Sequence, residues 1–459
     1  MKIPRLVSLA AFLLLAPFSS VAAADASRPN IVVFLADDLG WGDTSPYGNA
    51  EIKTPNLAKL AAQGVKFTQC YSAAGVCSPS RSAILTGRTP YRNGVWQHLS
   101  GVHEAHLRTS EITYPKLLKQ VGYETCHVGK WHLNARPHFN TAGFPQPNDH
   151  GYDYWMATHN NASPSHKNPD NFVRNGTPVG PTQGFSAQLV AAEGIRWLNE
   201  IRDPQKPFVL SVWVHEPHTP IASDPRFSGL YPGHPNSEYL GNVTQMDHAL
   251  GMVMDALQAK GLAENTLLIF TSDNGPEGQG GIKGGSTGGL RGRKRSDYEG
   301  GIRVPGIVRW PGRIKAGTVS EVPVIGTDIF ATVLEAAGVA LPQDRTLDGV
   351  SMIPAFAGRP VERKIPLFWR THVSPPGDRV ALRIGDWKLV GNDQMTTFEL
   401  YEIQKDWKEE NNLAAKLPDR AAEMKAALFK LWREIETEGP KQWWQGAKSP
   451  AKAGATLSY

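Results

Sequence analysis

A cysteine directly before a predicted helix is the first candidate for chemistry in this chain. Residues 75–87 read GVCSPSRSAILTG, and Pro79 falls where the first turn of a helix would lie. Arg81 comes one helical turn after Cys77, so its guanidinium can turn back toward the cysteine side chain. The free N–H groups of a helix N-terminus add partial positive charge. The pattern predicts a small side chain that faces an anion-binding site, although a lone cysteine is more often a buried structural residue.

Acidic side chains follow two of the predicted strands. Asp37 and Asp38 come directly after the apolar run 31–35, and Asp273 and Asn274 follow the run 266–270. Sites in α/β sheets lie at the carboxyl ends of the strands, and two adjacent acids repel each other unless a cation or solvent offsets them. Carboxylate and amide oxygens suit Ca²⁺ or Mg²⁺ better than zinc or copper. These residues predict a site for a hard cation, with solvated turn aspartates as the plainer alternative.

Basic side chains and imidazoles follow other strands. Lys130 and His132 come after the run 123–128, and His218 lies in a Pro-His-x-Pro context after the run 208–214. Such residues are usually surface groups when they occur singly, but a shared sheet edge would bring them to the aspartates. A basic cluster at 291–295, which includes Lys294, suggests positive charge for an anionic substrate. The glycine-rich segment 278–292 lacks the flanking strand and helix of a nucleotide-binding fingerprint.

Together these motifs resemble those of a known family. Cys77-x-Pro79-x-Arg81, followed by Leu-Thr-Gly-Arg at 85–88, resembles the signature of the type I sulfatases. In that family the cysteine is oxidised to formylglycine, an aldehyde whose hydrate is the nucleophile. The resemblance implies an alkaline-phosphatase-like α/β fold, with a mostly parallel central sheet flanked by helices and a smaller C-terminal α+β subdomain. A hydrated aldehyde oxygen also fits a hard cation better than a thiolate does, which favours modification of Cys77.

The resemblance implies a role for each motif residue. The metal ligands would be Asp37, Asp38, Asp273, Asn274 and the converted Cys77, with Ca²⁺ preferred to Mg²⁺. Arg81 would hold the formylglycine hydrate, while Lys130 and Lys294 would neutralise the sulfate oxygens. His132 would assist the hydrate, and His218 would protonate the departing alcohol.

The chain looks like the arylsulfatase and N-acetylgalactosamine-6-sulfatase branch of that family, which implies hydrolysis of sulfate monoesters. Residues 159–166 are rich in groups that hydrogen-bond sugar hydroxyls, so His159 and His166 are candidate substrate contacts. A polar surface loop explains that composition equally well. We expect an exo-acting sulfatase for a sulfated galactose or N-acetylgalactosamine. A phosphonate or phosphodiester hydrolase of the same superfamily and a catalytically silent glycan-binding relative are the alternatives.

An α/β domain must position these residues, and we expect it to span residues 28–345. The apolar runs at 31–35, 123–128, 208–214 and 266–270 predict strands, mostly buried on both faces, and 65–71 predicts another. Helices are predicted at 54–62, 115–121, 185–201, 238–260 and 328–337. Residues 134–183 lack periodicity, which predicts a long functional loop. A C-terminal subdomain at 360–440 should contain four antiparallel strands and a helix at 419–436, with a poorly ordered tail at 441–459.

The N-terminus predicts export. Lys2 and Arg5, the apolar run 6–18 and the alanines at 22–24 have the form of a signal peptide spanning residues 1–24, so we expect a periplasmic or extracellular protein without a stable membrane anchor. Loss of both charges lowers the net charge of +5 by two, which is too weak for nucleic-acid binding. An odd number of cysteines flags a special thiol. With Cys77 converted by a formylglycine-generating enzyme, Cys70 and Cys126 would form a disulfide or stay buried thiols.

Overall fold

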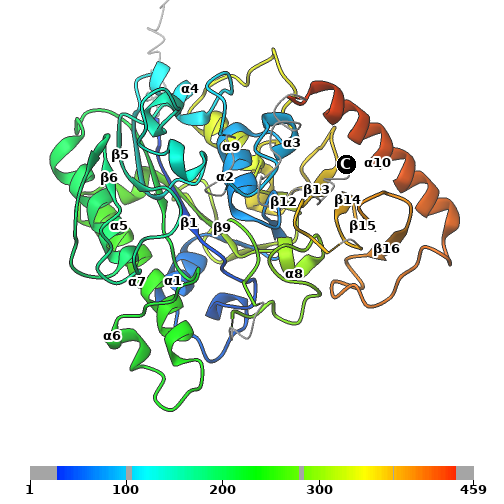
Figure 1. Ribbon diagram of the computed structural model, residues 1–459, viewed down its shortest axis with the longest axis horizontal. Coiled ribbons are helices and arrows are strands. Elements are labelled where there is room, and N and C mark those ends of the chain that lie inside the picture. The colour runs from blue at the N-terminus through cyan, green and yellow to red at the C-terminus, as the bar shows by residue number, and fades with distance from the viewer. Residues whose placement is uncertain (1–27, 100–105, 279–283, 376, 441–459) are drawn as a thin grey trace, which may run out of the picture.

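A ten-stranded mixed sheet forms the centre of the protein (Figure 1). The computed structural model describes residues 28–99, 106–278, 284–375 and 377–440. The parallel part of the sheet runs in the order β9 (Thr266–Ser272), β1 (Asn30–Ala36), β8 (Phe208–Trp213), β4 (Glu124–Lys130) and β5 (Tyr154–Thr158). Beyond β9 lie β10 (Gly306–Arg309), β2 (Val65–Phe67) and β11 (Thr318–Ser320), and beyond β5 lie β6 (Val173–Arg174) and β7 (Thr177–Pro178).

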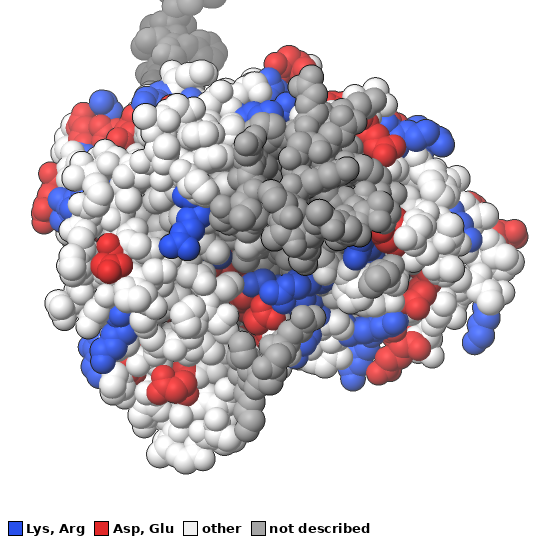
Figure 2. Space-filling model, in the orientation of Figure 1, with Lys and Arg blue, Asp and Glu red and all other residues white. Residues whose placement is uncertain are grey.

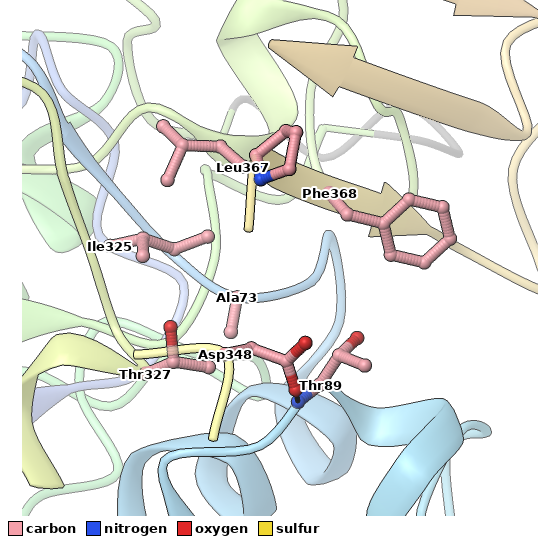
Figure 3. A pocket seen from close by; sticks show the side chains of 8 residues that line it. Ala73, Thr89, Ile325, Thr327, Asp348, Leu367 and Phe368 are labelled. Atoms are coloured by element: carbon pink, nitrogen blue, oxygen red, sulfur yellow. Dashed lines mark hydrogen bonds between the residues drawn. The ribbon is translucent and has the colours of Figure 1, made fainter. Parts of the chain in front are cut away.

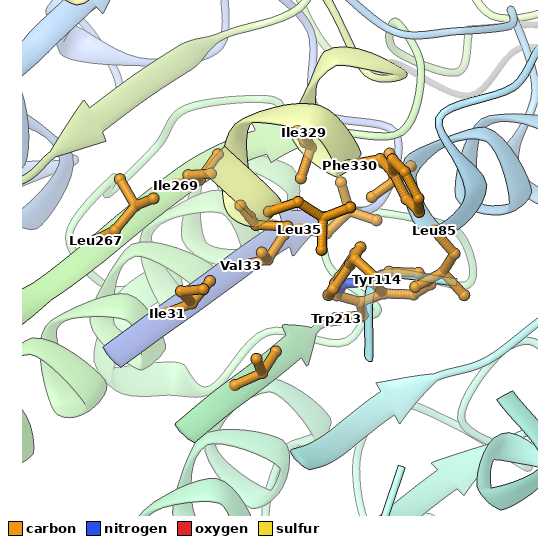
Figure 4. Close-up of a cluster of buried hydrophobic side chains, with 14 of the residues drawn as sticks. Ile31, Val33, Leu35, Leu85, Tyr114, Trp213, Leu267, Ile269, Ile329 and Phe330 are labelled. Atoms are coloured by element: carbon orange, nitrogen blue, oxygen red, sulfur yellow. The ribbon is translucent and has the colours of Figure 1, made fainter. Parts of the chain in front are cut away.

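Helices cover both faces of this sheet, because its central strands are apolar on both sides. On one face, Val32 and Phe34 belong to a core with α1 (Pro55–Gln63), α5 (Ser186–Arg196) and α7 (Ser237–Ala259). On the other face, Ile31, Val33 and Leu35 pack with α2 (Cys77–Thr86), α4 (Tyr114–Gln120) and α9 (Asp328–Ala336) (Figure 4). The helix α5 continues as a π-helical turn over Trp197–Ile201. The predicted helices and central strands are therefore confirmed, with shifts of a few residues at their ends.

A second, antiparallel sheet follows in the chain. It consists of β13 (Leu367–Arg370), β14 (Val380–Ile384), β15 (Trp387–Gly391) and β16 (Phe398–Glu402). The long helix α10 (Pro418–Glu438) packs its apolar side on this sheet. Where the two sheets' layers meet, Leu367 and Phe368 line a small pocket with Ala73 (Figure 3). The fold is thus α/β with a smaller C-terminal unit that carries an antiparallel sheet, as expected.

Two segments differ from the expectations. The strand expected at 65–71 is two strands, because the chain leaves the large sheet after β2 and pairs β3 (Cys70–Tyr71) with β12 (Val324–Ile325). The expected loop 134–183 contains β5, a fully buried strand that pairs in parallel with β4. At five residues, and flanked by polar segments, β5 is too short to give a clear period.

The remaining elements are short. They are the helices α3 (Pro90–Asn93), α6 (Pro225–Ser228) and α8 (Glu299–Ile302), and 3₁₀ turns at Ser45–Tyr47, Arg136–His138, Pro147–His150, Ala263–Asn265 and Pro354–Ala357. Cys70, Cys77 and Cys126 are all buried free thiols, so the disulfide alternative does not hold. In the part of the chain that the structure describes, no helix is long and apolar enough to cross a membrane. The predicted signal peptide and C-terminal tail lie outside the described residues.

Candidate active site

Four neighbouring strands bring the predicted residues to one edge of the large sheet. Taken in the sheet order β9, β1, β8, β4, the residues that follow these strands are Asp273 and Asn274, Asp37 and Asp38, His215 and His218, and His132, with Lys130 as the last residue of β4. Cys77 and Arg81 join them from the first turns of α2, and Lys294 comes from the loop before α8. Apart from the partly exposed His218, these residues are buried. On the face of the molecule that Figure 2 shows, the exposed basic and acidic side chains lie interspersed. The sheet edge therefore assembles one compact polar site.

Two aspartate–lysine pairs lie at the centre of the site. Lys130 Nζ is 2.7 Å from Asp37 Oδ2, and Lys294 Nζ is 2.6 Å from Asp38 Oδ2. Burial favours the neutral form of each carboxyl, but the charges of Lys130 and Arg81 hold the pKa of Asp37 well below its usual range. For Asp38, burial prevails over Lys294 and raises the pKa. The two neighbouring acids therefore differ in proton affinity, and Asp37 is the firmly ionised one.

Arg81 and Asn274 contact two further carboxylate oxygens, Asp273 Oδ2 and Asp38 Oδ1. Arg81 donates to Asp273 Oδ2 from Nε at 2.9 Å and approaches it from Nη2 at 2.7 Å, while its Nη1 donates to the carbonyl of Lys130 at 3.0 Å. Asn274 Nδ2 donates to Asp38 Oδ1 at 2.7 Å. The guanidinium is thus fixed by partners from two different strands, with no exposed surface.

The donor set fits a divalent cation. Ligand atoms of Asp37, Asp38, Cys77 and His218 all lie within 4.8 Å of one another. Asn274 Oδ1 is buried and accepts no hydrogen bond from any described residue, so this oxygen is available to a ligand. Asp38 has a φ of 65°, which is unfavourable for a residue with a side chain and is often found at functional sites. Buried carboxylates beside a free amide oxygen are ligands that Ca²⁺ prefers. His218, which is expected to act as an acid and not as a ligand, lies in the same group.

Cys77 is a neutral thiol in this setting. It begins α2, and its Sγ donates to Asp37 Oδ1 at 3.6 Å. Burial raises its pKa to about 12, against the lowering effect of Lys130 and Lys294. At neutral pH the residue is therefore a poor thiolate nucleophile.

His132 and His218 are both neutral, and each has a defined hydrogen-bonding arrangement. Burial, together with Lys130, lowers the pKa of His132 well below its usual value. His132 Nε2 donates to the carbonyl of Leu99 at 2.8 Å, which leaves the buried Nδ1 without a partner among the residues described. Burial and Lys294 lower the pKa of His218 in the same way. Its Nδ1 donates to the carbonyl of Thr219, so Nε2 is the nitrogen that faces Asp38 Oδ2, at 3.5 Å.

The two predicted sugar contacts are both at least partly buried. His166 is fully buried, and its ring packs 5.7 Å from that of His215. Neither of its ring nitrogens has a hydrogen-bond partner among the described residues. His159 is partly buried and donates from Nε2 to the carbonyl of Asn134 at 2.8 Å.

Two residues near the site were not singled out from the sequence. The ring of His98 lies 4.7 Å from that of His132, and burial together with Lys130 and Lys294 lowers its pKa to about 3. Glu277 pairs with Arg295 at 2.8 Å and lies 3.7 Å from Lys294. His98 follows no strand of the large sheet, so the rule that located the other residues does not apply to it. Glu277 lies as far beyond β9 as His218 lies beyond β8, so the same rule could have found it.

The fold and site define an α/β enzyme whose buried cations and hard oxygen ligands handle an anionic group. A family model described as "Sulfatase" matches residues 29–339, and one described as "N-sulphoglucosamine sulphohydrolase, C-terminal" matches residues 292–437. The chain belongs to the sulfatase family. It is therefore an enzyme that hydrolyses sulfate esters.

Known relatives agree with this conclusion. The chain is 34% identical over 401 residues to N-acetylgalactosamine-6-sulfatase of Canis lupus familiaris, covering 80% of this chain and 72% of the relative. It is 32% identical over 440 residues to steryl-sulfatase of Homo sapiens, covering 78% and 73%. Among solved structures, Ps i-CgsB in complex with k-i-k-neocarrahexaose has a TM-score of 0.79 and 28% identity, covering 92% of this chain and 94% of that one. The PsFucS1 sulfatase from Pseudoalteromonas sp. has a TM-score of 0.76 and 27% identity, covering 90% and 91%.

Proposed function

We propose that this sulfatase acts on sulfate monoesters through a formylglycine made from Cys77. The observation that carries the proposal is the neutral Cys77 thiol, which is held against Asp37 in a pocket of buried cations. A thiol with a pKa of about 12 is a poor nucleophile at neutral pH. The hydrate of an aldehyde at the same position offers two oxygens instead, which suit both a hard cation and attack on sulfur.

The proposed cation ligands are the oxygens of Asp37, Asp38, Asp273 and Asn274, with an oxygen of converted residue 77. The free Oδ1 of Asn274 supports this set. Ca²⁺ is the preferred ion, because it accepts irregular oxygen shells more readily than Mg²⁺ does. When bound, such an ion polarises a sulfate oxygen and lowers the pKa of a hydroxyl group beside it.

Residue 77 acts first in the proposed reaction. One hydroxyl of its hydrate passes its proton to the carboxylate of Asp37, which contacts the side chain of residue 77. The oxygen then attacks sulfur, and the bond from sulfur to the alcohol oxygen breaks. Lys130, Lys294 and Arg81 stabilise the negative charge on the transferred group. The departing oxygen takes a proton from Nε2 of His218. His218 is neutral without substrate, so it must gain this proton when an anionic ester binds next to it and raises its pKa.

His132 acts in the second step. Its Nε2–H is committed to the carbonyl of Leu99, so the free Nδ1 is the nitrogen that can accept a proton. Nδ1 removes the proton of the second hydroxyl of residue 77. The carbon–oxygen double bond re-forms while the bond to the sulfate oxygen breaks, so sulfate leaves and the aldehyde is restored. Water then hydrates the aldehyde again.

The proposed substrate is a sulfated sugar of the galactose or N-acetylgalactosamine type, cleaved from a chain end. The similarity to N-acetylgalactosamine-6-sulfatase and to Ps i-CgsB, which was solved in complex with k-i-k-neocarrahexaose, supports a saccharide. His159 and His166 stay proposed contacts, since His159 is only partly buried and His166 lies beside His215 at the end of β8. We also propose export by the N-terminal segment and conversion of Cys77 by a formylglycine-generating enzyme.

Replacement of Cys77 tests the nucleophile. Cys77→Ala should abolish turnover of 4-nitrophenyl sulfate while the far-ultraviolet circular dichroism spectrum is retained. Cys126→Ala is the matched control, since Cys126 is equally buried but lies within β4, away from the site. The mass of the peptide that contains residue 77 should fall by about 18 Da on conversion of thiol to aldehyde. Turnover close to wild type in Cys77→Ala would exclude the mechanism.

A substrate panel tests the ester class. Defined sulfated mono- and oligosaccharides should be desulfated, and only at a terminal sugar if the enzyme is exo-acting. Cleavage of aryl sulfates alone would count against a sugar substrate. Faster hydrolysis of phosphodiesters or phosphonates than of sulfates would favour the alternative hydrolase, and sugar binding without turnover by aldehyde-bearing protein would favour a silent relative.

A further inference from the structure

The loop that precedes Cys77 is held by the C-terminal sheet. Trp369 Nε1, in β13, donates to the carbonyl of Ser72 at 2.8 Å. Beyond the end of the same strand, Thr371 Oγ1 accepts a hydrogen bond from the backbone N–H of Gly75 at 3.2 Å. On the other side, the N–H of Ser72 donates to the carbonyl of Ile302 in α8 at 2.8 Å. The backbone of residues 72–75 is therefore fixed from two directions just before Cys77.

The hydroxyl of Thr371 also reaches the segment that carries Lys294. Oγ1 donates to Asp297 Oδ1 at 2.6 Å, and the backbone N–H of Thr371 donates to Asp297 Oδ2 at 3.2 Å. The N–H of Arg295 closes the connection by donating to the carbonyl of Gly75 at 2.8 Å. Thr371 is 1% exposed and Asp297 is fully buried, so water does not replace these bonds. One hydroxyl thus links three segments that are distant in the sequence.

His372, the residue after Thr371, contacts the segment that contains His98 and Leu99. His372 Nε2 accepts a hydrogen bond from the backbone N–H of His98 at 3.3 Å, and the ring of His98 packs on that of His132. The carbonyl of the next residue, Leu99, accepts the hydrogen bond that orients His132. The chain beyond β13 therefore contacts the backbone of the loop before Cys77 and the backbone of the segment that orients His132.

We propose that Thr371 is a positioning residue for catalysis. Its hydroxyl keeps the Cys77 loop and the Lys294 segment in a fixed relation, so that the nucleophile of residue 77 and the ammonium of Lys294 meet the same sulfate group. The inference rests on the proposed role of Cys77. Thr371 itself touches no reacting atom in this arrangement. Because a misplacement of about 1 Å can cost roughly 10²-fold in rate, loss of the hydroxyl should act mainly on kcat.

Four variants test this role. Thr371→Val keeps the shape but removes the hydroxyl, Thr371→Ala removes it without placing a methyl group against Asp297, and Thr371→Ser keeps it. Thr125→Val is the matched control, because the buried Thr125 Oγ1 likewise accepts from a backbone N–H, that of Asp153 at 2.9 Å, and lies 3.0 Å from the carboxylate of Asp153. Thr125 is near the start of β4, whereas the site is at the end of that strand.

Turnover of 4-nitrophenyl sulfate is measured per formylglycine, which is counted by mass spectrometry, and the urea midpoint is measured alongside. We expect kcat to fall about 10- to 100-fold in Thr371→Val and Thr371→Ala, with KM changed less than threefold and Thr371→Ser within about threefold of wild type. Thr125→Val should lose stability but keep kcat.

Three results would each overturn the proposal: wild-type kcat in Thr371→Ala, an equal loss in Thr371→Ser, or an equal loss in Thr125→Val. If Thr371→Val does not fold, the comparison of kcat between Thr371→Ala and Thr371→Ser tests the proposal. Activity in Cys77→Ala would instead refute the nucleophile, so the two failures can be told apart.

Discussion

Replacement of Lys130 by methionine tests whether a cation shares the carboxylate of Asp37. Lys130 and Asp37 are fully buried and 2.7 Å apart, and methionine keeps most of the apolar length without the charge. The variant leaves Asp37 with a more distant positive partner, Arg81 Nη2 at 3.8 Å. If Asp37 also binds Ca²⁺, the ion should restore part of the lost stabilisation, and the effect of the substitution will depend on calcium.

The magnitude follows from the burial of the pair. Removing one partner of a buried ion pair costs about 3–5 kcal/mol, because the other charge is left uncompensated. Arg81 still offsets part of the charge of Asp37, so we expect about 3 kcal/mol in the presence of EDTA. A divalent ion bound to the same carboxylate should reduce that loss to about 1 kcal/mol. Loss of the positive charge that faces the sulfate should independently lower kcat by about 10²–10³-fold.

Urea unfolding with EDTA and with excess Ca²⁺, on wild type and variant, measures the four free energies. Lys388→Met is the matched control, because Lys388 is equally buried and pairs with Glu299 at 2.9 Å and Glu409 at 2.8 Å. It should lose a similar amount of stability, and calcium should not change that loss. If calcium leaves the loss in Lys130→Met unchanged as well, Asp37 does not bind the ion, and the proposed ligand set is wrong.

Two further substitutions probe elements that support the site. Asp247 accepts hydrogen bonds from the N–H groups of Asn56 and Leu57 at the start of α1, and burial raises its pKa to about 6. The folded state therefore binds more protons than the unfolded state between about pH 4 and pH 6. The free energy of unfolding then falls as pH rises through this window. Asp247→Asn should flatten that fall by about 2–3 kcal/mol in urea titrations at pH 4.5 and 7, and an unchanged slope would contradict the raised pKa. Gly129 has a φ of 106°, and a Cβ there would lie 1.9 Å from the carbonyl oxygen of Trp213, so Gly129→Ala should cost at least about 3 kcal/mol. Gly48→Ala, at a φ of 91° with nothing within 4 Å, should cost only about 1 kcal/mol, and equal losses in both would show that the overlap is relieved elsewhere.

Most of the site could be predicted because its residues follow strands. The apolar runs of β1, β8 and β9 are unmistakable, and parallel strands must present their carboxyl ends at a common edge. The sequence therefore predicts that four residues lie together at this edge, namely Asp37, Asp38, Asp273 and Asn274. The spacing of residues does not indicate the chemistry of Cys77. That expectation comes from the resemblance of its motif to the sulfatase signature.

The parts that could not be predicted depend on contacts between distant segments. Thr371 and His98 meet the site only because β13 ends beside the loop that carries Cys77. Nothing in the local sequence around either residue marks it. His166 is a further case, since the polar composition of residues 159–166 does not show that the fold buries its ring, with neither ring nitrogen partnered among the described residues. Composition alone does not tell which groups meet a polar side chain.

The charges of the site explain why a cation should matter for substrate as well as for chemistry. Arg81, Lys130 and Lys294 carry three positive charges, and Asp37, Asp38 and Asp273 offset them when ionised through contacts of 2.6 to 2.7 Å. With these pairs intact, the site has little net attraction for an anion. A divalent ion held by the same carboxylates would draw their charge to itself, which would free the lysines to face a sulfate group. On the proposed ligand set, the buried ion pairs would be the resting form of an anion site, and a bound cation would convert it into a receptive one.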